Sequence, residues 1–132
     1  MISAALMCLA MNVYHEARSE PMVGQYAVAH VVINRVNSTR WPNDVCSVVH
    51  QGLDRGRHKC QFSWYCDGKS DKPRDTKAYE QARMIAHGVY YGNLDDFVEG
   101  ATHYHAHYVY PEWAKSKTRT VRIDDHIFYR WD

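Results

Sequence analysis

One corner of the sequence, residues 14–21, constrains the fold more than any other stretch. Before it, apolar residues recur at three-then-four spacing on one helical face: Ile2, Leu6, Leu9 and Val13. This face predicts a first helix from about Ser3 to Ala17, with Glu16 on the edge of the face, three residues after Val13. A carboxyl held against apolar packing loses hydration, which raises its pKa. The pattern predicts a proton-carrying Glu16, and a Glu pointing to water from a fraying helix end is the alternative.

The second helix is predicted to begin at the same corner. Ser19 is expected to cap it, and Pro21 fits its first turn, where a missing N–H costs little. From residue 22 to 36 apolar side chains occur on nearly all sides, which is typical of a central, buried helix. Its polar residues, such as Asn34 and Arg35, would then need hydrogen-bond partners.

The rest of the chain predicts shorter helices first and strands later. Asp44 is expected to cap a short helix to Val49, and residues 51–75 form a long loop. A helix starting at residue 75 or 76 should run through His87 and end at Gly88. Residues 102–108 alternate, and residues 121–123 with 127–129 predict a small C-terminal β-hairpin. The expected class is α+β, mainly helical, with residues 1–132 forming a single domain.

Composition and charge exclude several classes of protein. A net charge of +1 without a run of Lys or Arg argues against nucleic-acid binding. The apolar stretch 1–11 has no positive charge before it and is too short to cross a bilayer. We therefore expect no membrane span and no signal peptide, with synthesis in the cytoplasm.

Cysteine and histidine patterns allow metal chemistry without favouring it. His103, His105 and His107 alternate and would share one side of a strand, but such a trio rarely binds zinc without a fourth ligand. Another conceivable zinc set lacks paired C-x-x-C spacing and comprises Cys46, His58, Cys60 and Cys66. Cys60 and Cys66 are close enough in sequence to bridge, whereas Cys8 is expected to be a small buried hydrophobe. We predict no metal and no other cofactor. A nucleophilic Cys paired with a His is an alternative, although no local pattern favours a particular Cys.

The two glutamates of the corner suggest glycoside chemistry. In glycosidases one carboxylic acid protonates the leaving oxygen, and a second, where present, acts as nucleophile or base. Glu20 lies across the corner from Glu16, so we expect it to cap or brace the loop and not to face the same point.

Six stretches of the chain resemble the SleB/CwlJ family of cell-wall hydrolases. They occur in the family's order along nearly the whole sequence: HEARSEP (15–21), GQYAVAHVVINRV (24–36), WPN (41–43), QFSWYCDG (61–68), residues 102–104 and HIFYR (126–130). Departures include Ser19, where Gly is usual, and the histidine-rich residues 103–107.

The resemblance implies a lysozyme-like fold and a monomeric peptidoglycan glycosidase acting at the bacterial cell wall. It assigns the catalytic acid to Glu16 and places Gln61, Phe62, Ser63 and Tyr104 in the glycan groove, with Glu20 and Asn34 as possible support. Trp64, Tyr65 and Trp113 are candidates for stacking on sugars. With no added binding domain, the chain looks like a phage endolysin or an excised catalytic domain.

The expected reaction cleaves the β-1,4 bond between N-acetylmuramic acid and N-acetylglucosamine, leaving a 1,6-anhydro end as lytic transglycosylases do. Ordinary hydrolysis by water is the close alternative. A zinc amidase using the clustered histidines and a non-catalytic glycan-binding module are more distant alternatives.

Overall fold

The computed structural model describes residues 3–92 and 94–132, and Ile2 of the predicted first face lies outside them. The helices are α1 (Ala4–Ala17), α2 (Met22–Val36), α3 (Val45–Val49) and α4 (Thr76–Tyr90), with 3₁₀ turns η1 (Leu53–Arg55), η2 (Ser63–Cys66) and η3 (Glu112–Ser116). The strands are β1 (His103–Ala106), β2 (Thr118–Ile123) and β3 (His126–Arg130). The α+β, mainly helical prediction is confirmed.

Helix α1 begins and ends as predicted. The Ser3 hydroxyl accepts a hydrogen bond from the Leu6 N–H at 3.2 Å, which satisfies one of the free donors of the first turn. Leu6, Leu9 and Val13 are buried, so the described part of the predicted apolar face points into the core.

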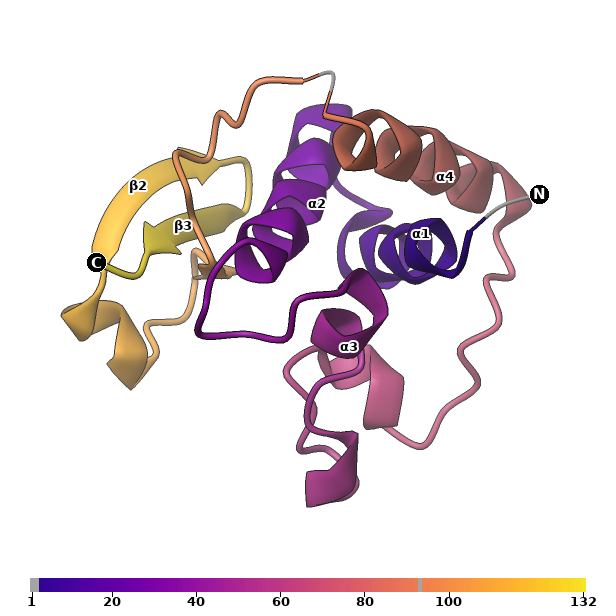
Figure 1. Ribbon diagram of the computed structural model, residues 1–132, viewed down its shortest axis with the longest axis horizontal. Helices are drawn as coiled ribbons and strands as arrows, with labels where there is room; N and C mark the ends of the chain where they lie inside the picture. The colour runs from indigo at the N-terminus through magenta and orange to yellow at the C-terminus, as the bar shows by residue number, and fades with distance from the viewer. Residues whose placement is uncertain (1–2, 93) are drawn as a thin grey trace.

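Helix α2 lies at the centre of the molecule, between the sheet and the pair α1 and α4 (Figure 1). Ala29 and Val32 join the core formed with α1, α3 and α4, whereas Ala27 and Val31 pack with Phe128 of the sheet. A helix with a core on two sides must be apolar on most of its surface, which explains the pattern of residues 22–36.

The predicted cap of α2 is wrong. Pro21 stands at the N-cap position, Ser19 makes no capping bond, and no side chain caps the helix. The corner is held by the backbone instead, because the Glu20 N–H donates to the Ala17 carbonyl at 2.9 Å. The Gln25 side chain donates to the Glu20 carbonyl at 3.0 Å, giving this buried polar residue a partner.

The predicted end of α4 is also wrong, because the helix continues through Gly88 to Tyr90. Val89 is buried and anchors the last turn to the core. The chain leaves the helix at Gly92, whose φ of 73° is the left-handed conformation that glycine adopts without steric cost.

The predicted hairpin forms from β2 and β3 and turns at Asp124 and Asp125. The alternating segment before it becomes β1, which pairs antiparallel with the other edge of β3, so the sheet order is β1-β3-β2. This third strand carries Tyr104 opposite Phe128, where Tyr104 packs against the core that the sheet shares with α2.

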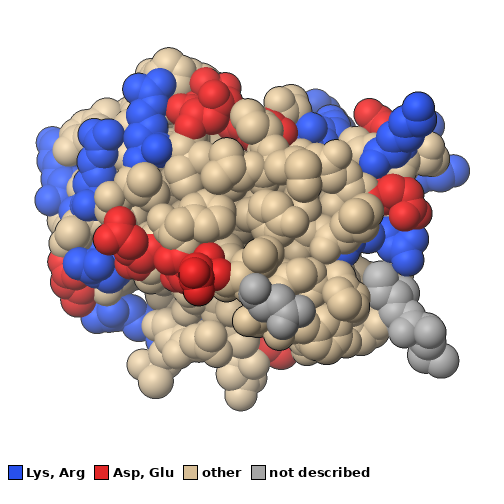
Figure 2. Space-filling view, turned by 90° about the horizontal axis from the view of Figure 1, so that it is seen from above, with Lys and Arg blue, Asp and Glu red and all other residues tan. Residues whose placement is uncertain are grey.

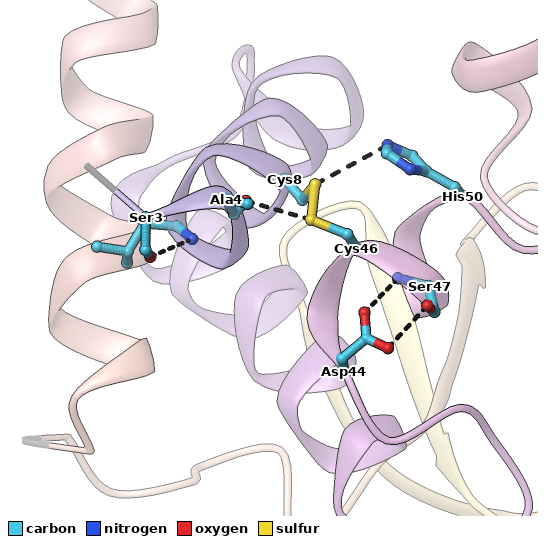
Figure 3. The surroundings of a disulfide bond; sticks show 8 residues. Ser3, Ala4, Cys8, Asp44, Cys46, Ser47 and His50 are labelled. Carbon is cyan, nitrogen blue, oxygen red and sulfur yellow. Dashed lines mark hydrogen bonds between the residues drawn. A yellow bond between two sulfur atoms is a disulfide. The ribbon is translucent and has the colours of Figure 1, made fainter. Parts of the chain in front are cut away.

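Two disulfides fix the segments around α1. Cys8 is bonded to Cys46, which corrects the expectation that Cys8 is a free buried hydrophobe, and the bond joins α1 to α3 (Figure 3). Asp44 caps α3 as predicted, accepting from the Ser47 N–H at 2.9 Å. Cys60 and Cys66, whose pairing the sequence left open, are also bonded, and the bond closes the loop that precedes and includes η2.

The charged residues on the surface are of both signs, as the net charge of +1 indicates. Both signs of charge occur on the face drawn in Figure 2, where uncharged residues cover much of the middle. Among the described residues, none of the helices combines the length and apolar character that a bilayer crossing needs.

Candidate active site

A cleft of about 260 Å³ forms where the end of α1, the end of α2 and the sheet meet. Its walls come from six separate parts of the chain. The lining residues are Glu16, Arg35, Gln61, Phe62, His103, Tyr104, His105, Ala106, Trp113 and His126.

Glu16 projects from the last turn of α1 into this cleft and is half-buried. Burial raises the pKa of its carboxyl above the ordinary value, because the charged form loses hydration. The Tyr104 hydroxyl donates a hydrogen bond to Oε1 of Glu16, and this bond together with the Arg35 charge lowers the pKa in part. The site therefore favours the proton at rest while offering two groups that stabilise the carboxylate.

Arg35 forms the floor behind Glu16 and is only 6% exposed. Its Nε donates to the Thr102 carbonyl at 2.7 Å, and its guanidinium lies 5.2 Å from the Phe62 ring centroid. Burial lowers its pKa to about 10, with the Tyr104 and Glu16 charges acting in the opposite direction, so the side chain stays a cation at neutral pH. Within residues 3–92 and 94–132, its Nη1 is buried without a hydrogen-bond partner.

Glu20 and His126 form a second titratable pair beside the cleft. Nδ1 of His126 lies 2.9 Å from Oε1 of Glu20, whose side chain is 8% exposed. Burial raises the pKa of Glu20 to about 7, helped by the hydrogen bond and negative charge of Asp124 and by the charge of Asp125. Burial lowers the pKa of His126, so its imidazole is neutral at pH 7. Glu20 thus links the α1–α2 corner to β3, and it is not among the residues that line the cleft with Glu16.

The structure brings several of the sequence-predicted residues into one cleft: Glu16, Gln61, Phe62, Tyr104 and Trp113. It adds Arg35 and His126, to which the sequence assigned no site role, and His103 and His105, which the sequence suggested only as zinc ligands. One signal was available for Arg35, since a cation predicted inside a buried helix requires partners.

Other candidates lie outside the cleft. Trp64 is buried, donates from Nε1 to Oδ1 of Asn12 at 2.8 Å and stacks on His15. Ser63 is exposed at the start of η2 and lines neither the cleft nor its neighbouring pocket. Asn34 donates to the Ala101 carbonyl at 2.9 Å, tying α2 to the segment before β1.

The three alternating histidines do not all line the cleft. His103 and His105 line the cleft, and His105 Nε2 lies 2.8 Å from the Tyr129 hydroxyl. His107 follows the end of β1, and its Nε2 lies 3.7 Å from Asp125. Among the described residues, the groups with metal-ligating geometry contain none of these histidines. The alternative zinc set also loses its free thiols, because Cys46, Cys60 and Cys66 are all in disulfides.

Similarity to known proteins agrees with this fold. The structure matches the catalytic domain of the germination-specific lytic transglycosylase SleB from Bacillus anthracis, with a TM-score of 0.77 and 27% identity over 98% of this chain and 97% of that one. The catalytic domain of the Bacillus cereus SleB protein matches with a TM-score of 0.71 and 27% identity, covering 96% and 89%.

Full-length relatives are similar over most of this chain. The spore cortex-lytic enzyme of Halalkalibacterium halodurans is 35% identical over 127 residues, and that of Bacillus subtilis is 31% identical over 120 residues. Each alignment covers 91% of this chain but 33% and 35% of the relative, so the chain spans about a third of their length. The model of the cell wall hydrolase family matches residues 19–129, beginning just after Glu16. Because this match covers most of the sequence, the chain belongs to the cell wall hydrolase family.

Proposed function

We propose that this chain cleaves peptidoglycan glycan strands between N-acetylmuramic acid and N-acetylglucosamine, as a lytic transglycosylase with Glu16 as its catalytic acid. The observation that carries the proposal is the Glu16 carboxyl, half-buried in the cleft with its pKa raised and with Tyr104 and Arg35 beside it. The SleB catalytic domain, named a lytic transglycosylase, supports the same reaction class. The site of action would be the bacterial cell wall.

In the first step Glu16 gives its proton to the glycosidic oxygen as the bond to C1 of the muramic acid breaks. The acid becomes a carboxylate at that moment, so groups that stabilise its negative charge also stabilise the transition state. Tyr104 donates a hydrogen bond to this carboxylate, and the Arg35 charge lies behind it.

In the second step the electron-poor C1 is captured by an oxygen nucleophile. The lining of the cleft, within the described residues, contains one carboxyl group, that of Glu16. A second carboxylate as nucleophile has therefore no support there, and the C6 hydroxyl of the muramic acid is the proposed nucleophile. Glu16 accepts the hydroxyl proton, the 1,6-anhydro ring closes, and the acid is regenerated.

Hydrolysis is the second candidate, and one observation favours it. His126 lines the cleft and is neutral at pH 7, so its imidazole can accept a proton from an attacking water. The two outcomes share the first step and differ only in which oxygen captures C1.

The substitution Glu16→Gln tests the assignment, because it keeps the shape of the side chain and removes the transferable proton. We expect cleavage of purified sacculi to fall by roughly 10²–10⁴-fold, the range typical of a general acid. Glu80→Gln on the exposed face of α4 is a matched control and should keep full activity. Wild-type activity in Glu16→Gln would overturn the catalytic assignment.

Mass spectrometry of the released fragments separates the two candidates, because an anhydro end is lighter than a reducing end by one water. A chelator added to the same assay tests the zinc amidase alternative, which also predicts cuts between sugar and peptide. Binding to sacculi without any release would support a glycan-binding module instead.

A further inference from the structure

A second cavity, of about 440 Å³, adjoins the cleft. It shares Gln61 and His103 with the cleft, so a glycan in one would extend into the other. We call it the tryptophan pocket, and its lining residues are Arg40, Trp41, Gln51, Gln61, His103 and Trp131.

Aromatic rings form the walls of the tryptophan pocket. The Trp41 and Trp131 rings meet edge to face with centroids 5.8 Å apart, and His103 lies 5.6 Å from Trp41 and 5.8 Å from Trp131. Such flat apolar surfaces with polar edges suit the faces of sugar rings.

Two cations lie close to the Trp131 indole ring: Arg40, which lines the pocket, and Lys117, which does not. The Arg40 guanidinium is 4.4 Å from the Trp131 centroid, and the Lys117 ammonium is 4.1 Å from it. Within the described residues, neither side chain has an acidic group within ion-pair distance. A cation held by an aromatic face keeps its N–H donors free for an anion.

The charges around the pocket are of one sign. Its lining includes Arg40 and no acidic residue in the described part of the chain. Asp132 follows Trp131 but is engaged elsewhere, with Oδ1 3.1 Å from Arg130 and Oδ2 accepting from the Thr118 hydroxyl. His103 does not compete for an anion, because burial and the Arg35 and Lys117 charges lower its pKa to about 4.

We propose that the tryptophan pocket is a substrate subsite that binds a carboxylate attached to the glycan strand, through Arg40 in the pocket lining, with the Lys117 charge beside Trp131 adding to the attraction. This inference rests on the proposed function, since it takes a glycan as the ligand. Peptidoglycan offers such a carboxylate in two places: the lactyl group of a peptide-free muramic acid, and the acidic groups of a stem peptide. A sugar whose lactyl group is capped and carries no peptide would lack it.

The test measures by calorimetry how tightly glycans bind to the Glu16→Gln variant, in which we expect almost no cleavage. The probes are one tetrasaccharide of alternating N-acetylglucosamine and N-acetylmuramic acid in three forms: with free lactyl carboxylates, with those carboxylates as methylamides, and with stem peptides attached. We expect an acidic form to bind about tenfold more tightly than the methylamide, the size of one charge-assisted contact. The added variants Arg40→Gln and Lys117→Gln should together remove the difference, whereas the control Lys77→Gln on α4 should keep it.

Comparing the three forms of the tetrasaccharide identifies the source of the carboxylate. Tight binding of the peptide-free acid identifies the lactyl group, and tight binding of only the peptide-bearing form identifies the stem peptide. The preference should also weaken as salt is raised, a measurement that needs no substitution in the pocket.

Equal binding of all three forms, or a preference that survives the double substitution, would overturn the subsite. The proposed function would then stand if the wild-type protein still cleaves sacculi. If no form binds, the subsite fails, and the cleavage assay shows whether the proposed function fails with it.

Discussion

Two glutamates on either side of one corner show how neighbours decide what a buried carboxyl can do. Burial raises the pKa of both Glu16 and Glu20. Glu16 faces a hydroxyl donor and a cation, which stabilise its carboxylate. Glu20 faces Asp124 and Asp125, which oppose its carboxylate.

The difference fits the proposal that Glu16, and not Glu20, donates the proton. A general acid must lose its proton during the reaction, so its environment has to tolerate both the neutral and the charged form. At Glu16, burial favours the neutral form, whereas Tyr104 and Arg35 stabilise the charged form. At Glu20, burial, Asp124 and Asp125 all disfavour the charged form.

Removing Arg35 tests this contrast with the largest expected effect. Arg35→Met takes away the cation behind Glu16 and leaves the buried Thr102 carbonyl without its donor. We expect cleavage to fall by about a hundredfold, as when one electrostatic group is lost, and the free energy of unfolding to fall by about 1–3 kcal/mol. The Glu16 pKa should rise further, moving the alkaline limb of the pH–rate profile upward. Arg83→Met, at an exposed ion pair, is the control.

An unchanged pH–rate profile in Arg35→Met would show that the cation does not act on Glu16. The contrast between the two glutamates would then rest on Tyr104 beside Glu16 and on Asp124 and Asp125 beside Glu20.

Tyr104→Phe removes the other stabilising group and should have a smaller effect. The phenol donates to Glu16, so its loss leaves the carboxylate with one hydrogen bond fewer. We expect about a tenfold loss of cleavage rate, as for a hydrogen bond to a charged group, and again an upward move of the alkaline limb. The ring still packs against Phe128, so urea unfolding should be nearly unchanged. Tyr108→Phe at an exposed position serves as the control, and a cleavage rate equal to wild type in Tyr104→Phe would contradict the role.

The helical part of this fold was predictable because helices are local. Apolar spacing located α1, an apolar surface on nearly all sides located α2, and the Asp44 cap located α3. The Glu16 position on the edge of the α1 face followed from the α1 periodicity. The errors fell at helix ends, where Ser19 and Gly88 are residues that often cap but here do not. Backbone bonds at the corner and the burial of Val89 decided those ends, and neither is visible in local sequence.

The site was less predictable because it is made by long-range pairing. Tyr104 reaches Glu16 across 88 residues, and this requires β1 to pair with β3, a register that the alternating pattern of residues 102–108 does not specify. The same pairing brings His126 to the cleft. Trp64 shows the opposite case: an aromatic in a matched motif that packs on Asn12 and His15 outside the cleft.

Asp124→Asn tests the Glu20 side of the contrast and should have the smallest effect. Asn tolerates the φ of 49° at this turn, so the substitution removes charge with little backbone cost. Because the native pKa of Glu20 is about 7 and its ordinary value is 4.5, the native state binds more protons than the unfolded state between these values. The free energy of unfolding therefore falls as pH rises through this window.

In Asp124→Asn, the free energy of unfolding should fall less with rising pH than it does in the wild type. Without the Asp124 charge the Glu20 pKa moves back toward its ordinary value, so Asp124→Asn should gain about 0.5 kcal/mol over wild type at pH 8 and less at pH 5, measured by urea unfolding. Asp95→Asn, at an exposed position, should show no such pH dependence. A gain at pH 5 as large as at pH 8 would mean that Asp124 does not act through Glu20. The pKa values of the two glutamates would then differ for another reason.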